Sequence, residues 1–198
     1  VRASITLVSA TLHIRRLFLA ILAISFFWAM GAVLAAQFPP LVKNILYADQ
    51  SVATLFLAVF SVGVAIGSIA INRMLKGEVS ARFAPASALL MGVFVLLLYW
   101  MTRDWPPSSE LVDIAEFLRH PLGWAVVLDL LGVAIAGGMF VVPLYAFLTT
   151  TVPKSETART VAANNIVNSG AMVVATMMLT GLVLLGVSVA ETLFLVAV

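Results

Sequence analysis

Long apolar segments alternate with short polar segments along the whole chain. Five apolar segments have the length of complete membrane spans, at about 17–36, 52–71, 83–101, 122–148 and 161–186, and a sixth begins near Thr192. A helix needs about 20 predominantly apolar residues to cross the hydrocarbon core of a bilayer. The pattern therefore predicts an all-α membrane protein with five complete spans and an incomplete last helix.

The composition also indicates that the bilayer is the solvent of this chain. Hydrophobic residues make up 63% of its 198 residues, charged residues make up 10%, and the mean hydropathy is +1.13. Soluble domains carry roughly 25% charged residues, so the composition does not fit a soluble fold. The net charge of +2 is a weak sign of nucleic-acid binding, because in a membrane protein the location of each charge matters more than the sum. The absence of cysteine excludes disulfides. Because the chain begins at Val1 and stops inside an apolar segment, we expect a piece of a larger protein.

Basic residues predict the orientation of the spans. Alternate loops divide them into a set of eight (Arg2, Arg15, Arg16, Arg73, Lys76, Arg82, Lys154 and Arg159) and a set of three (Lys43, Arg103 and Arg119). Positive charge concentrates on the cytoplasmic side of a membrane protein, so the amino terminus is expected in the cytoplasm. The opposite, outer loop PPSSELVDIAEFLRHP is predicted to form a short helix on the membrane surface. Ser108 or Ser109 would cap it, and its apolar stripe would comprise Leu111, Ile114, Ala115 and Leu118.

Polar residues inside spans face other helices or water, because lipid offers them no partner. The second span has one small or polar face, formed by Thr54, Ala58, Ser61, Ala65, Ser68 and Asn72, beside a Gly63–Gly67 step. The fifth span carries Asn164, Asn165 and Asn168, and a stripe of Asn165, Ser169, Met172, Thr176 and Thr180. The second-span face is interpreted as close helix packing or as the wall of a water-accessible cavity. The asparagines would bond backbone carbonyls freed in the preceding span or contact a polar substrate group.

The remaining spans carry fewer polar groups. The first contains Trp28 and Gln37 and is predicted to break at Pro39–Pro40. The third is the most uniformly apolar, so we expect it to lie outermost, against lipid. The fourth contains Asp129, the only acid well inside a span, which should face the bundle interior. Asp129 would accept a proton or cation, attract an ethanolamine amine, or hydrogen-bond a neighbouring helix.

No catalytic pattern is present. The sequence lacks a Ser/His/Asp set, a cluster of metal-ligand residues and a glycine-rich phosphate loop, and neither His13 nor His120 has a partner by spacing. We therefore expect no enzymatic activity, no cofactor and no metal.

Several segments together resemble the major facilitator superfamily. They are FFWAMGAVLAAQFPPLVKN (26–44), SVATLFLAVFSVGVAIGS (51–68) and GGMFVVPLYAF (137–147), with ARTVAANNIVN (158–168) after it. More narrowly, they are similar to the bacterial lysophospholipid transporter branch. That branch includes transporter domains fused to a 2-acylglycerophosphoethanolamine acyltransferase and an acyl-carrier-protein synthetase.

The resemblance implies that residues 1–198 are the carboxy-terminal half of a twelve-helix transporter, with an amino-terminal half as its partner. The implied function is movement of lysophospholipid across the bacterial inner membrane by alternating access, with fused acyltransferase domains as further partners. The cavity would be lined by Trp28, Gln37, Ser61, Asp129, Asn165, Asn168, Ser169 and Thr176. Transport of another amphipathic molecule, and a membrane anchor for the fused domains, are the alternatives.

Gating residues are also implied by the resemblance. Gly137, Gly138 and Pro143 would let the fourth span bend near its cytoplasmic end, unless the glycines only permit close packing. Asn72 and Arg73 match part of the family's cytoplasmic loop signature. The chain departs from stand-alone members of the branch in having Ala35 and Ala36 where they have an arginine, and Gln37 is only a neutral substitute for that charge.

Overall fold

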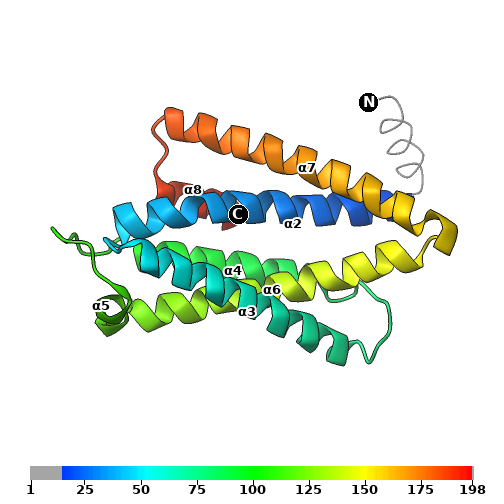
Figure 1. Cartoon of the computed structure of the whole chain (residues 1–198), viewed down its shortest axis with the longest axis horizontal. Coiled ribbons are helices and arrows are strands. Elements are labelled where there is room, and N and C mark those ends of the chain that lie inside the picture. Colours follow the sequence, from blue (N-terminus) through cyan, green and yellow to red (C-terminus); the bar gives the residue numbers. More distant parts are fainter. Residues whose placement is uncertain (1–14, 198) are drawn as a thin grey trace.

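The computed structural model describes residues 15–197, and apart from one isolated β-bridge all regular structure in that range is helical (Figure 1). The elements are α2 (Arg15–Pro40), the π-helical turn η1 (Leu41–Ile45), α3 (Gln50–Met74), α4 (Ala84–Thr102), α5 (Ile114–Arg119), α6 (Gly123–Thr150), α7 (Lys154–Leu184) and α8 (Val189–Ala197). The expectations for Arg2 and His13 fall outside the described residues.

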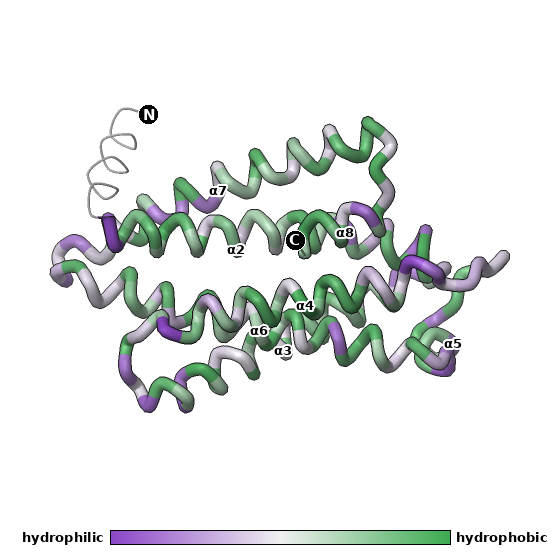
Figure 2. The backbone as a smooth tube through the Cα atoms, turned by 180° about the vertical axis from the view of Figure 1, so that it is seen from behind, coloured by the Kyte–Doolittle hydropathy of each residue, from purple (hydrophilic) through white to green (hydrophobic). Residues whose placement is uncertain are grey.

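Five helices of the described chain are long and apolar enough to cross a membrane: α2 with η1, α3, α4, α6 and α7. This confirms the five predicted spans, and α8 begins somewhat earlier than the predicted sixth. Hydrophobic residues cover the long helices, whereas hydrophilic residues gather in the loops at the two ends of the bundle (Figure 2). The chain is thus an all-α, multi-pass membrane protein.

Helix α6 lies at the centre of the bundle, packed against α2, α3, α4 and α7. Its contact with α3 is a close approach of two backbones. A Cβ atom on Gly63 of α3 would lie 2.5 Å from the Cβ of Ala134, and one on Gly138 of α6 would lie 2.5 Å from the carbonyl oxygen of Val64. Small residues of this kind let membrane helices pack at short range, where dispersion and backbone contacts replace a hydrophobic driving force.

The third span, which was expected to lie outermost against lipid, packs on one side against other helices of the described chain. In the most apolar window of α4, 22% of the residues are buried, against only 6% in that of α7. Helix α4 packs on α6 and α8, and the ring of its Phe94 covers Gly132. A uniformly apolar helix reads the same in sequence whether its neighbours are lipid tails or side chains, because both are equally apolar.

The predicted break of the first span at Pro39–Pro40 is wrong. Helix α2 continues through both prolines to Pro40 and then widens into η1, where the N–H of Leu46 donates to the carbonyl of Leu41 at 3.0 Å. Proline removes an N–H donor and crowds the preceding turn, and a π-helical turn absorbs such a defect without ending the helix.

The outer-loop helix is present as α5, but its cap and its apolar contact differ from the prediction. Asp113, rather than Ser108 or Ser109, accepts a hydrogen bond from the N–H of Glu116 at 2.8 Å. The buried residue is Phe117, whose ring packs against Trp105 and Phe56. Ile114 and Leu118 of the predicted stripe also pack against this core, so the apolar side of the short helix faces the protein.

Candidate functional site

A cluster of polar side chains joins α2, α6 and α7 and consists of Ser25, Trp28, Tyr145 and Asn168; we call it the polar cluster. The hydroxyl of Ser25 donates to Oδ1 of Asn168 at 2.7 Å. The amide Nδ2 of Asn168 and the indole Nε1 of Trp28 both donate to the hydroxyl oxygen of Tyr145, at 3.3 Å and 2.9 Å. Helices α2, α6 and α7 are thereby linked, and the tyrosine oxygen receives one hydrogen bond from α2 and one from α7.

The polar cluster runs from the protein interior to its surface. Ser25 and Asn168 are buried, Tyr145 is half-buried, and Trp28 is 40% exposed. Because the Tyr145 oxygen already accepts two hydrogen bonds, its own O–H is left to donate, and no described residue accepts from it. A phenol has one donor and two lone pairs, so this hydroxyl is a free donor close to the surface.

Asn164 lies one helical turn before Asn168 and is fully buried, at 0% exposure. Its Nδ2 donates to Oδ1 of Asn165 at 3.4 Å, but its own Oδ1 has no hydrogen-bond partner among the described residues. A buried acceptor without a partner costs about 1–3 kcal/mol. The buried part of α7 next to the polar cluster therefore holds an unsatisfied acceptor.

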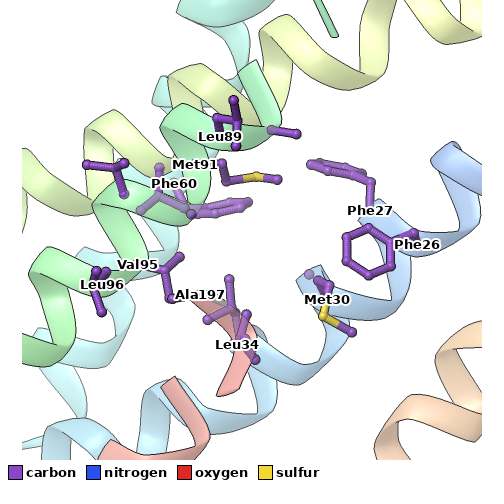
Figure 3. A pocket seen from close by; sticks show the side chains of 16 residues that line it. Phe26, Phe27, Met30, Leu34, Phe60, Leu89, Met91, Val95, Leu96 and Ala197 are labelled. Atoms are coloured by element: carbon purple, nitrogen blue, oxygen red, sulfur yellow. The ribbon is translucent and has the colours of Figure 1, made fainter. Parts of the chain in front are cut away.

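An apolar cavity of about 370 Å³ adjoins the same stretch of α2. Its walls come from α2, α4 and α8, with Phe60 of α3 and Val133 of α6, and the labelled side chains of Phe26, Met30 and Met91 surround it (Figure 3). Phe27 belongs to both regions, because it lines the cavity while its ring lies 5.8 Å from that of Trp28. The same turn of α2 thus contributes side chains both to the polar cluster and to the apolar cavity.

The structure brings only two of the predicted cavity residues together, Trp28 and Asn168. Ser61 lies on the exposed face of α3, where its hydroxyl donates to the carbonyl of Leu57 in its own helix. Gln37 and Asp129 are buried elsewhere in the bundle, and neither belongs to the polar cluster.

The predicted stripe of α7 consists of exposed and half-exposed residues. Asn165 and Ser169 are exposed, and Thr176 is half-exposed with its hydroxyl bonded to the carbonyls of Met172 and Val173 in its own helix. The buried amide of Asn168 bonds side chains and none of the backbone carbonyls of the preceding span, which were one of the two partners predicted for the asparagines. Side chains from two other helices satisfy it because they reach the buried face of α7 from α2 and α6.

The predicted gating residues lie in two places. Helix α6 is continuous through Gly137, Gly138 and Pro143. A Cβ on Gly137 would lie 3.0 Å from the Phe27 ring, whereas Gly138 faces the backbone of α3. Asn72 and Arg73 are exposed at the end of α3, before a turn in which Gly77 has a φ of 78°.

Ser25 and Tyr145 were missed by sequence reasoning. Tyr145 stands within GGMFVVPLYAF, where it is the one residue with a polar group between Gly138 and Thr149, and this was a usable signal. Ser25 gave none, because a single serine in an apolar span is ordinary.

Within residues 15–197 no group of three metal-ligating side chains is found. Comparison of the chain with protein-family models, curated proteins and solved structures finds no match. The fold and the site define a class, a polytopic helical membrane protein with a polar cluster beside an apolar cavity.

Proposed function

We propose that the chain is the carboxy-terminal half of a major facilitator transporter that moves lysophospholipid across the bacterial inner membrane for re-acylation. The observation that supports the proposal most is the polar cluster beside the apolar cavity on one turn of α2. A lysophospholipid has one polar headgroup and one acyl chain, and it requires two such surfaces side by side. Binding sites for small amphipathic molecules are commonly apolar with a few placed polar groups.

In this proposal, the free O–H of Tyr145 donates to a phosphate oxygen, and the exposed indole of Trp28 covers the glycerol backbone. The acyl chain enters the cavity past Phe27. No charged side chain belongs to the polar cluster. Since an unpaired charge is costly to bury, an uncharged site favours a headgroup without net charge, such as the zwitterionic phosphoethanolamine.

Alternating access would come from movement of the two halves around this site, with the amino-terminal half covering the exposed faces of α3 and α7. The polar cluster links α7 to α2 and α6 by hydrogen bonds to side chains. Such bonds can exchange with water when the site opens, so α7 is the helix best suited to move. Fused acyltransferase domains would consume the delivered lysolipid.

Tyr145→Phe tests the proposal, because it removes the hydroxyl that would donate to the phosphate, together with the oxygen that accepts from Trp28 and Asn168. In proteoliposomes of the complete transporter, we expect transfer of labelled lysophosphatidylethanolamine to fall about fivefold to tenfold, the loss of one hydrogen bond to the headgroup, while the yield of folded protein is retained. Thr149→Val is the matched control, since the Thr149 hydroxyl bonds only carbonyls of its own helix.

Three results would contradict the proposal. Equal transfer by Tyr145→Phe and the wild type would show that the tyrosine hydroxyl does not bind the substrate. Equal transfer of monoacylglycerol, which lacks the phosphate, would indicate a transporter of another amphipathic molecule. No transfer by the wild type would favour a membrane anchor.

A further inference from the structure

Asp129 is the single buried acidic side chain of the chain, whose nine acidic residues all lie within 49–191, in the described range. It is 6% exposed, whereas Asp49 is half-buried and the other seven are exposed. Asp129 occupies the first half of α6, about 9 Å along the helix from Gly123 at a rise of 1.5 Å per residue. The carboxyl group is therefore inside the bundle and below the outer end of the span.

The carboxyl group has no partner that would keep it ionised. Its Oδ2 is buried without a hydrogen bond, and the ion pair found among the described residues joins Arg103 to Asp104. From the elements packed against α6, the described titratable groups are Arg15 and Arg16 of α2, Arg73 of α3, Tyr99 of α4, Glu116 and Arg119 of α5, and Lys154, Glu156 and Arg159 of α7. The basic groups in this set all stand in the first two turns or the last turn of their helices.

We infer that Asp129 is a proton-binding site: the carboxyl group carries a proton while α6 is packed as in this structure. An ionised carboxylate in an apolar interior is too costly to persist unpaired, and protonation is the usual way in which such a group is neutralised. When water reaches the site, the O–H bond of the carboxylic acid breaks, the proton passes to water, and a carboxylate remains. Bundle opening and proton release are therefore coupled.

This site is separate from the polar cluster. Tyr145 is 16 positions further along α6, about 24 Å at the helical rise, and the hydrogen bonds of the polar cluster do not include Asp129. The inference does not rest on the proposed substrate. In a transporter it would supply the coupling ion, and in any other protein it would make opening of the bundle depend on pH.

Infrared spectroscopy of the protein in lipid vesicles tests the inference, because the C=O stretching band of a carboxylic acid is resolved from the bands of a carboxylate. At neutral pH we expect the wild type to show one such band from this chain. Asp129→Asn should abolish it, and Glu110→Gln, which changes an exposed acid, should leave it intact. Transfer assays with lysolipid do not enter this measurement, so failure of the proposed function would not alter its outcome.

A second measurement needs no variant. Labelling aspartate with ¹³C at the side-chain carboxyl should shift the band in the wild type, since the other aspartates are exposed or half-buried. A band that survives Asp129→Asn, or that does not shift with labelled aspartate, would overturn the inference. Absence of the band at neutral pH would also overturn it, because the carboxylate would then be held by a cation.

Discussion

Helices α6 and α7 follow one another in the chain, have similar lengths, and are held in the bundle in different ways. Of the 28 residues of α6, 15 are buried, whereas five of the 31 residues of α7 are buried. Gly138 of α6 contacts the backbone of a neighbouring helix, whereas Gly170 and Gly181 of α7 have nothing within 4 Å of an added Cβ. Buried asparagines are found on α7 and not on α6.

Helix α6 is held by close packing of complementary shapes, whereas α7 is held by hydrogen bonds between side chains. Glycine contacts between backbones have no alternative arrangement, so α6 and α3 are expected to move as one body. The hydrogen bonds of Asn168 can be exchanged for bonds to water or to a ligand. Apart from Leu179, the buried side chains of α7 lie in its first half. Helix α7 is therefore held mainly through its first half.

Gly67→Leu should have the largest effect. An added side chain at Gly67 collides with the backbone at Ile135 of α6, which cannot turn aside as a side chain can. Overpacking of this kind costs about 1–3 kcal/mol and occasionally more, so the yield of folded protein in detergent should drop sharply. The matched control is Gly181→Leu, which places the same side chain in open space on α7. Equal losses of folded protein in the two variants would show that the α3–α6 contact is not the fixed part.

The hydrophobic pattern alone predicted the number of spans and their approximate bounds, because a run of about 20 apolar residues is typical of a membrane-spanning helix. The pattern did not predict which helices pack against one another. The bond between Ser25 and Asn168 joins residues 143 positions apart, and a local pattern does not encode which helix face meets which. The small-residue face of α3 illustrates this: Gly63 and Gly67 are the packed residues, whereas the adjacent Ser61 is exposed.

Two local predictions, the cap of α5 and the break at Pro39–Pro40, failed because tertiary contacts overrode the local preference of the residues. The choice of Asp113 over the nearby serines as the cap of α5 depends on Phe117 finding a pocket against Trp105, which is a tertiary contact. The survival of α2 through Pro39 and Pro40 depends on the widened turn that follows. Propensity gives the preference of a residue, and packing decides whether that preference is followed.

Asn168→Leu should have an intermediate effect, confined to α7. The substitution removes both hydrogen bonds of the amide and leaves the hydroxyl of Ser25 buried without its acceptor, at a cost of about 1–3 kcal/mol. We expect faster hydrogen exchange of the α7 amides and unchanged exchange in α6, since local openings follow local contacts. Ser169→Leu, at an exposed neighbouring position that takes no part in the hydrogen bonds of the polar cluster, is the control. Faster exchange in both helices would mean that α6 and α7 form one cooperative unit.

Gly181→Ala should have the smallest effect and the opposite sign. Glycine is less favourable than alanine in a helix interior by roughly 0.8–1.0 kcal/mol, and a methyl group at Gly181 meets nothing within 4 Å. The melting temperature should therefore rise slightly. Gly170 is 11 residues earlier, close to three full turns, so Gly170→Ala samples the same face and should behave alike. A fall in melting temperature for both variants would show that this face of α7 is covered by a closely packed neighbour, and α7 would then be fixed by shape, as α6 is.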